Sequence, residues 1–222
     1  MIDKSCGSKL IACSPASNTA TTIHKRSRSI ATTTRETILA AARQTAQLHG
    51  YAGLNFRDLA ETVGIKSASI HYYFPSKADL GSAVAQRYWE DSAAALEALS
   101  ADAADPLQSL RAYPHVFRQS LANENRLCMC SFMAAEYDDL PTAVKKEVQT
   151  YADVHVDWLS KMLVAAGVAS AKESEARARG IYAAVAGAQL VARSRSDIAL
   201  YDAMIETYRN AGLFGPSLAS TD

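Results

Sequence analysis

Residues 54–80 read LNFRDLAETVGIKSASIHYYFPSKADL, and their spacing predicts two short helices joined at a glycine. Asn55 marks the start of the first helix, because an N-cap side-chain oxygen accepts hydrogen bonds from the free amides of the first turn. Gly64 ends that helix, since glycine readily adopts the left-handed conformation found at helix ends. In the second helix, Ile70 and Phe74 lie four residues apart and face inward. This pattern predicts a helix-turn-helix whose later helix reads DNA.

The second helix leaves hydrogen-bonding side chains outside and carries no carboxylate, which suits a surface that meets phosphates. An ordinary solvated face is the simpler interpretation of the same residues. We expect Lys66, Ser69 and His71 to contact base edges, and the two tyrosines and the lysine that follow them to contact the DNA backbone. The predicted DNA-binding residues are Lys66, Ser67, Ser69, His71, Tyr72, Tyr73 and Lys77.

Residues 64–80 resemble the DNA-binding domain of the TetR family of transcriptional regulators, whose pattern is roughly G-V-S-x-G-x-L-Y-x-H-F-x-x-K-x-x-L. Three positions depart from it, because Lys66, Ala68 and His71 stand where the family often has Ser, Gly and Tyr. We therefore expect the cap of the second helix to pass to Ser67. The resemblance implies an all-α fold, a homodimer, a palindromic double-stranded DNA operator and a C-terminal domain that binds a small-molecule effector.

Composition and charge agree with a DNA-binding head on an acidic body. The chain has 222 residues, of which 49% are hydrophobic, so it can bury a core for one or two domains. Residues 1–80 hold ten Lys or Arg and five Asp or Glu, whereas the remainder holds thirteen and eighteen. The net charge of zero is therefore the sum of a basic N-terminal part, residues 1–80, and an acidic remainder. This distribution favours DNA contact by the N-terminal part.

The sequence predicts a cytoplasmic protein without a membrane span. No run of 18 apolar residues occurs in it. Four cysteines without regular spacing indicate free thiols in a reducing compartment rather than a disulfide framework.

We divide the chain into four regions, each with its own composition. The predicted regions are a disordered tail at 1–31, a DNA-binding domain at 32–80, a ligand-binding and dimerisation domain at 81–214, and a C-terminal tail at 215–222. Lys25, Arg26 and Arg28 end the first tail, and they are either a basic arm that contacts DNA or part of a solvated segment. The first helix is expected to begin at Thr33, with Glu36 completing a capping box, and to end at His49.

Beyond Pro106 every segment has a helical period. The expected helices cover about 106–122, 126–137, 141–166, 172–194 and 197–211. The sequence has no Gly-rich phosphate loop, no His/Cys set with metal spacing and no nucleophile elbow. This favours a binding protein over an enzyme, with no cofactor and no metal.

Aromatic, Met and His residues on the inward stripes of the middle helices are candidates for the effector site. By the resemblance, the effector cavity lies among these helices, and apolar walls suit a small hydrophobic ligand. Each of these residues could equally belong to the core. The ligand-binding candidates are Phe117, Phe132, Met133, Tyr151, His155, Trp158 and Met162.

Cys128 and Cys130 lie in a segment that resembles the sixth helix of the family, where a cysteine near the Cys128 position is frequent. Residues two apart in a helix point about 200° apart, so the two thiols cannot easily pair or share a metal. Cys128 is therefore either a small core residue or a thiol that senses electrophiles or oxidants, with Arg126 as the neighbouring cation that could lower its pKa.

Residues 181–190 are apolar around most of the helix circumference, so they need cover on two sides. The resemblance implies that this helix and the last one form a four-helix bundle across a two-fold axis, while an intrachain core is the alternative. The predicted dimer-interface residues are Ile181, Val185, Gly187, Ala188, Tyr201 and Ile205.

Together these features predict a ligand-responsive transcriptional regulator, a repressor that a small-molecule effector releases from its operator. Two alternatives stay open at this point. The protein could be a thiol-based regulator that senses through Cys128, or a helical protein that acts mainly through a protein partner.

Overall fold

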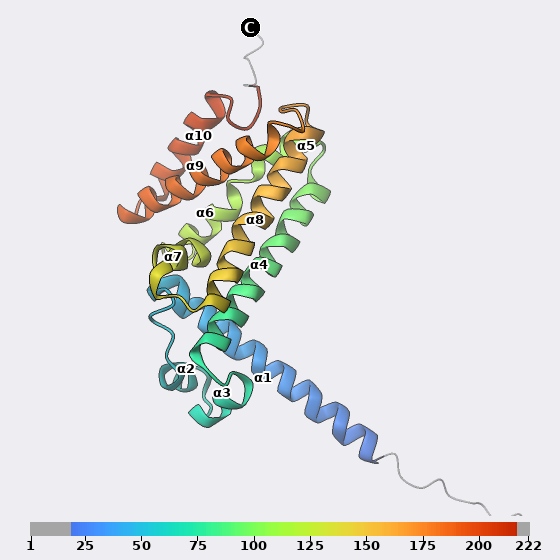
Figure 1. The fold of residues 1–222 in the computed structure, drawn as a ribbon, viewed down its shortest axis with the longest axis vertical. Coiled ribbons are helices and arrows are strands. Elements are labelled where there is room, and N and C mark those ends of the chain that lie inside the picture. The colour runs from blue at the N-terminus through green and yellow to red at the C-terminus, as the bar shows by residue number, and fades with distance from the viewer. Residues whose placement is uncertain (1–18, 217–222) are drawn as a thin grey trace, which may run out of the picture. The chain divides into compact units, whose positions relative to one another are not determined.

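The computed structural model describes residues 19–216, and it describes side chains from residue 33 onward. These residues form ten α-helices and one 3-10 helix, with no strand in the described range (Figure 1). The chain divides into two compact units, residues 1–36 and residues 37–222. The described part of the first unit is helical, and the rest of the fold concerns the second. None of the described helices is long and apolar enough to cross a bilayer.

Helix α1 runs from Thr19 to His49, so the expected start at Thr33 is wrong. Residues 19–32 contain no Gly or Pro, and a capping-box pattern starts a helix only where the preceding residues do not continue it. The predicted tail is therefore helical over 19–31, while residues 1–18 lie outside the described range. The expected end at His49 is confirmed, with Gly50 following at a φ of 66°.

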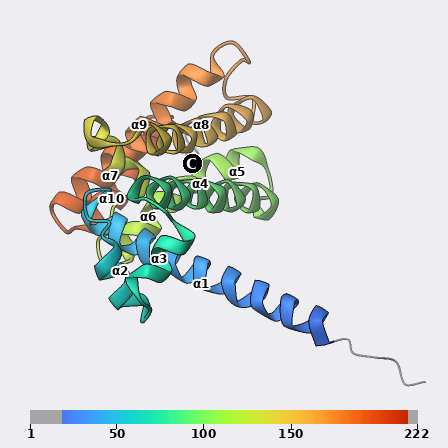
Figure 2. The same cartoon turned by 60° about the horizontal axis from the view of Figure 1, so that its bottom comes forward.

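The predicted helix-turn-helix is confirmed as α2 (Phe56–Val63) and α3 (Ser67–Tyr73), which pack against each other (Figure 2). Asn55 caps α2, because its Oδ1 accepts hydrogen bonds from the amides of Arg57 at 2.8 Å and Asp58 at 3.4 Å. Gly64 ends α2 in the left-handed region, with a φ of 74°.

The expected cap of α3 at Ser67 is wrong. Lys66 occupies the N-cap position in an extended conformation, with φ −76° and ψ 143°, and its side chain makes no capping hydrogen bond within the described chain. Ser67 is already the first residue of the helix. The turn at Gly64 places Lys66, rather than Ser67, at the extended position before the helix. Helix α3 thus begins without a side-chain cap, and the buried Ile70 and Phe74 hold it in place.

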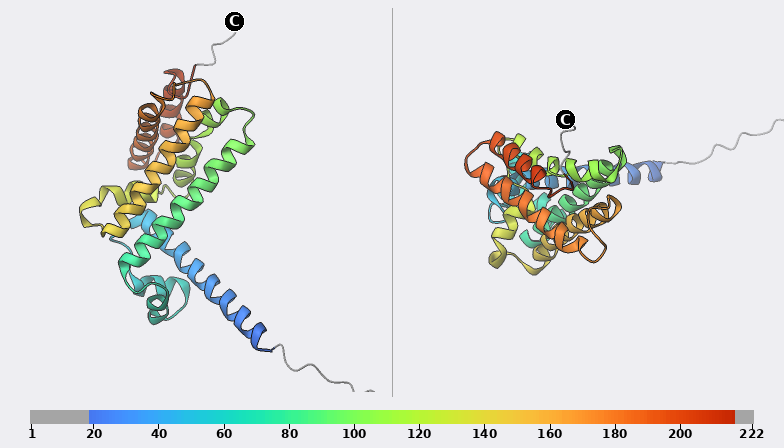
Figure 3. Two further views of the ribbon diagram at one scale, coloured as in Figure 1. Left: turned by 45° about the vertical axis from the view of Figure 1, so that its right-hand side comes forward. Right: turned by 90° about the horizontal axis from the view of Figure 1, so that it is seen from above.

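The body is built on two long helices, α4 (Lys77–Asp102) and α8 (Thr142–Ala165), which run side by side (Figures 1 and 3). The predicted capping box of α4 is confirmed, because the Ser76 and Asp79 side chains each accept a hydrogen bond from the other's backbone amide. Helix α9 (Ser174–Ser194) packs along α8, and α10 (Ile198–Asn210) packs against α9.

The helix expected at 106–122 is two helices, α5 (Pro106–Ala112) and α6 (His115–Ala122). Pro114 separates them, since proline has no amide to donate and its ring disfavours a continuous helix. Helix α7 (Met129–Ala135) and the short 3-10 helix η1 (Tyr137–Asp139) replace the helix expected at 126–137.

Candidate DNA-binding surface and effector site

The predicted reading face of α3 is open to solvent. Tyr72 is 79% exposed, and Lys66 and His71 are also exposed, whereas Ser67, Ser69 and Tyr73 are partly covered. The His71 ring packs edge-on against Phe56 of α2, with ring centroids 4.6 Å apart. Tyr72 and Tyr73 make a similar edge contact at 5.1 Å. These contacts fix the orientation of the face while its polar atoms point outward.

Lys77 has a structural partner that the sequence does not reveal. Its Nζ donates a hydrogen bond to the Ala52 carbonyl at 2.9 Å and lies 4.7 Å from the centre of the Tyr51 ring. The ammonium group therefore ties the start of α4 to the turn that follows α1. Its contact with a phosphate stays a prediction, and it would have to be made from this position.

Glu136 is a second residue at this junction, and sequence reasoning missed it. Its carboxylate accepts hydrogen bonds from the amides of Tyr51 at 2.6 Å and Ala52 at 3.1 Å. A Cβ at Gly50 would overlap this carboxylate, so glycine is needed there for its size as well as for its positive φ. No local pattern could reveal the contact, because 84 residues separate Glu136 from Ala52.

The ring of Tyr51, which lies in the turn between α1 and the helix-turn-helix, also contacts the long helices of the body. At Gly81 of α4, an added Cβ would lie 2.6 Å from the Tyr51 ring and 3.1 Å from a Val144 methyl group of α8. Gly81 is therefore small because Tyr51 packs directly against the helix backbone there. Movement of α4 or α8 at this point would shift the end of α1.

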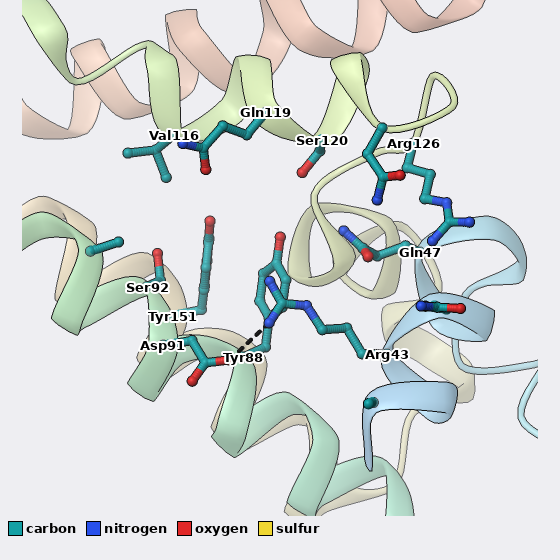
Figure 4. Close-up of a pocket in the computed structure, with 14 residues that line it drawn as sticks. Arg43, Gln47, Tyr88, Asp91, Ser92, Val116, Gln119, Ser120, Arg126 and Tyr151 are labelled. Carbon is teal, nitrogen blue, oxygen red and sulfur yellow. Dashed lines mark hydrogen bonds and ion pairs between the residues drawn. The ribbon is translucent and has the colours of Figure 1, made fainter. Parts of the chain in front are cut away.

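A cavity of about 360 Å³ lies between α1, α4, α6 and α8 (Figure 4). The hydroxyl ends of Tyr88 and Tyr151 point toward α6, where Gln119 and Ser120 face them (Figure 4). The lining mixes apolar groups with amides, hydroxyls and charges. It comprises Ala40, Arg43, Gln44, Gln47, Tyr88, Asp91, Ser92, Ala95, Val116, Gln119, Ser120, Asn123, Arg126 and Tyr151.

Two arginines face this cavity, and they differ in their partners. Arg43 of α1 pairs with Asp91 of α4 at 2.8 Å and stacks over the Tyr88 ring at 4.6 Å. Arg126 is only 8% exposed, and one terminal nitrogen donates to Glu124 at 2.6 Å. Its Nε is buried and has no hydrogen-bond partner among the described residues.

Most of the residues expected to form an apolar effector site are packed in the core, so their contact with an effector stays a prediction. Of the seven candidates, Tyr151 alone lines the cavity between α1, α4, α6 and α8. Phe117, Met133, His155 and Trp158 are buried core residues, and Met162 is half-buried beside them. The rings of Tyr113, Phe117, His155 and Trp158 pack against one another and fill the space between them.

Two of these candidates line separate hollows. Trp158 faces a cavity of about 160 Å³ between α4 and α8. Phe132 faces one of about 360 Å³ with Leu127, Leu190 and Arg193.

His155 lies at the centre of a buried hydrogen-bonded chain rather than in an open site. Its Nε2 pairs with the Ser92 hydroxyl at 2.8 Å, and its Nδ1 pairs with the Tyr113 hydroxyl at 2.9 Å. Burial lowers the pKa of His155 to about 3, so the ring is neutral at physiological pH. Ser92 also lines the cavity between α1, α4, α6 and α8, and this hydrogen-bonded chain therefore supports one of its walls.

Both described cysteines are free and buried. Cys128 precedes α7 as its N-cap residue, so the expectation that both cysteines lie within one helix is wrong. Its amide donates to the Gln189 side chain of α9 at 3.1 Å. Burial raises the pKa of Cys130, while the Arg43 charge acts in the opposite direction, so the cation that acts on this thiol is Arg43 and not Arg126.

The predicted dimer residues are mostly core residues of a single chain. Ile181, Val185, Ala188, Tyr201 and Ile205 are buried, and Gly187 alone is exposed. Their own chain covers them, since α9 packs against α6, α8 and α10. The sequence period shows that two sides are apolar, but it does not show which side the same chain covers.

The other side of α9 is exposed and apolar. Leu190 is 57% exposed and Val191 is 44% exposed, and Gly187 and Ala183 lie on the same face one and two turns earlier, respectively. Apart from its two chain neighbours and the nearby backbone of α9 itself, no described atom lies within 4 Å of the position that a Cβ would take at Gly187. We call Ala183, Gly187, Leu190 and Val191 the α9 stripe.

Comparisons with known proteins agree with this arrangement. Residues 38–84 match the model of the bacterial regulatory proteins of the tetR family. A transcriptional regulator of the TetR family from Agrobacterium tumefaciens is 32% identical in its solved structure, with a TM-score of 0.73 over 80% of this chain and 96% of that one. The chain belongs to the TetR family. The recognition of a regulator rather than an enzyme is confirmed.

Further relatives of this TetR-family protein support the same fold. A TetR transcriptional regulator from Legionella pneumophila is 28% identical, with a TM-score of 0.74 over 79% of this chain and 95% of that one. The HTH-type transcriptional regulator RutR of Escherichia coli K12 is 35% identical over 92 residues. That match spans 41% of this chain and 42% of RutR.

Proposed function

We propose that this protein is a transcriptional repressor that binds a palindromic operator as a homodimer and leaves it when a small molecule occupies the body. The observation that carries the proposal is the outer face of α3. It is exposed, it lacks carboxylates, and it stands on the buried Ile70 and Phe74. An outer face of this kind at the second helix of a helix-turn-helix suits insertion into a major groove.

The α9 stripe is the surface that we propose for dimerisation, in place of the buried residues predicted at first. Small residues at Ala183 and Gly187 allow a close approach of two helices, and Leu190 and Val191 supply apolar area. Gly187→Glu should yield a monomer by light scattering, whereas Ala101→Glu, at an exposed position of α4, should remain a dimer. A wild-type protein that is monomeric at micromolar concentration would refute this part.

The cavity is placed so that an effector could influence the head. Its walls include Arg43 and Gln47 of α1, the helix that leads into the helix-turn-helix, and Asp91 of α4. A ligand there bridges α1 and α4. The ligand releases the protein from DNA only if it binds the arrangement that cannot bind DNA more tightly than the arrangement that can. A ligand with equal affinity for both arrangements does not shift the equilibrium between them.

DNA binding can be tested with two matched tyrosines. Tyr72→Ala on α3 should weaken binding both to DNA from upstream of the gene and to random duplex. Tyr137→Ala, at an exposed tyrosine of η1 that stacks on Lys145, should bind like the wild type. Ser69→Ala should mainly relax the preference between the two DNAs. Equal affinity of all three variants and the wild type in a gel shift would reject α3 as the reader.

Buried cysteines favour a pocket ligand over thiol sensing as the signal. A reactive thiol needs access and a depressed pKa, whereas Cys128 and Cys130 are almost fully covered and burial raises the pKa of Cys130. We therefore regard Cys128 as a core residue.

A further inference from the structure

Arg126 occupies an unusual position in the wall of the 360 Å³ cavity. A guanidinium group stays charged at all physiological pH values, and burying it costs free energy unless its donors are paired. Glu124 pairs with one end of the group, but 73% of the Glu124 side chain is exposed, so that partner lies at the surface. The Nε is buried without a partner among the described residues. A residue that lines the cavity thus carries one donor that lacks an acceptor.

The other charges of the lining are already balanced. Arg43 and Asp91 form a pair, and Asp91 also lies 3.9 Å from Arg87 on its own helix. Gln44, Gln47, Gln119 and Asn123 are neutral amides. Burial raises the pKa of Tyr88 and of Tyr151 well above the usual value, so both hydroxyls are neutral donors. Arg126 is therefore the one charged residue of this lining whose acidic partner, Glu124, lies outside the lining.

The shape of the cavity adds an apolar requirement. Tyr88 and Tyr151 stack with ring centroids 5.3 Å apart, and Val116, Ala40 and Ala95 complete a less polar part of the wall. A volume of about 360 Å³ lies near the lower end of the range for small-molecule sites, which is roughly 300–1,000 Å³. The occupant must be small and must combine an anionic group with an apolar body.

We propose that the effector of this protein is a small organic acid whose carboxylate binds the guanidinium group of Arg126 and whose apolar or aromatic body lies against Tyr88 and Tyr151. This inference rests on the proposed effector-responsive function and names the ligand class of the same cavity. A guanidinium edge presents two parallel N–H groups, which match the two oxygens of a carboxylate. A neutral amide of the same shape offers one acceptor and adds donors that meet the cation unfavourably.

The test uses pairs of probes that differ in charge alone. Benzoate, phenylacetate and cyclohexanecarboxylate are each compared with the corresponding amide by calorimetric titration of the full-length protein without DNA. We expect at least one acid to bind more tightly than its amide by roughly tenfold, the value that one charge-assisted hydrogen bond supports. Arg126→Gln should bring that ratio close to one, and Arg179→Gln, which alters an exposed ion pair of α9, should leave it unchanged.

A second variant decides the matter if Arg126→Gln does not fold. Gln47 is buried in the same cavity wall, and Gln47→Glu places a carboxylate of nearly the same shape there. This variant should lose binding of the acid by tenfold or more while it keeps any binding of the amide. The proposal is overturned if no acid binds, if acids and amides bind the wild type equally, or if Gln47→Glu and Arg126→Gln both keep the preference for the acid.

DNA binding is measured separately on the same samples, so the two proposals can fail independently. A protein that binds DNA but does not prefer the acids would refute the ligand class alone. A protein that prefers the acids but binds no DNA would refute the regulatory function alone. An acid that binds and also releases the protein from its DNA would support both.

Discussion

The outer face of α3 and the cavity between α1, α4, α6 and α8 both offer cations and hydrogen-bond donors, but they differ in access to water. On α3, Lys66 and Tyr72 are exposed, so each contact with DNA competes with water and salt. In the cavity, Arg126 is removed from solvent, and one well-placed partner gains more there. Affinity for DNA is therefore spread over many residues, whereas the choice of effector can depend on one.

The largest expected effect on stability and DNA binding comes from removing a buried side chain that supports α3. Phe74→Ala removes a buried ring beneath α3, and truncation of a buried Phe costs about 3–5 kcal/mol of unfolding free energy. DNA binding should be lost, because Ile70 is the one fully buried side chain of α3 that would remain to hold the reading helix in place. Chemical denaturation and a gel shift check both parts.

Tyr72→Ala on the same helix is the matched control for that variant. Its side chain is 79% exposed, so the unfolding free energy should change by no more than about 0.5 kcal/mol while DNA binding weakens. Equal stability of the Phe74→Ala and Tyr72→Ala proteins would contradict the conclusion that Phe74 supports α3 from the core while Tyr72 lies on its exposed surface.

The wall of the cavity can be tested through pH. Burial lowers the pKa of His155 to about 3, below the value of about 6.5 in the unfolded chain. As the pH falls, the unfolded chain is therefore protonated at this residue before the folded protein is. The contribution of the neutral His155 ring to the free energy of unfolding is fully present above pH 6.5 and is lost progressively as the pH falls toward 3. We expect a loss of about 2 kcal/mol between pH 7.5 and pH 5 from this group.

Urea unfolding at the two pH values measures this loss. His155→Gln should show a smaller dependence on pH, because glutamine does not titrate. His115→Gln, at an exposed position of α6, should behave like the wild type. An unchanged pH dependence in the His155 variant would show that other groups cause the acid sensitivity.

Between the two regions lies the contact of Glu136 with the turn after α1. Glu136→Gln keeps the shape but weakens two charge-assisted hydrogen bonds to the amides of Tyr51 and Ala52, at a cost of about 1–2 kcal/mol for a half-buried group. We also expect the effector to alter DNA affinity less in this variant, since the body holds the end of α1 less firmly. Asp138→Asn in the exposed η1 is the control. Unchanged stability and unchanged coupling would show that this contact is incidental.

The two regions also differ in how far the sequence predicted them. Every determinant of the α2–α3 pair, from Asn55 to Phe74, lies within one short stretch, so the Asn55 cap, the Gly64 stop and the helical period were sufficient to predict the pair, although not the cap of α3. The cavity brings together Arg43, Tyr88 and Arg126 from distant segments, and no local period reveals such a meeting. Sequence identified apolar stripes correctly, as at Val185 and Tyr201, but it could not show that the same chain covers them.

The start of α1 shows a further limit of local signals. Thr33 and Glu36 form a good capping pattern, yet the helix continues upstream because nothing between Thr19 and Thr33 stops it. Stops set by Gly, as at Gly50 and Gly64, were predicted correctly. A residue that cannot continue a helix is therefore a stronger signal than a residue that is able to start one.

The smallest expected effect concerns Cys128, and it separates the cavity from a thiol switch. Cys128→Ser replaces a buried thiol that contacts the Tyr88 and Tyr151 side chains, and it should cost about 1–2 kcal/mol of stability because a hydroxyl is harder to desolvate than a thiol. The backbone amide of residue 128 still donates to Gln189, so the position of α7 is kept. Release from DNA by an effector should stay at the wild-type level, because Cys128 does not line the cavity. A variant that folds, dimerises and binds DNA but no longer responds would make thiol chemistry the signal, and the cavity would then be a structural feature without a sensing role.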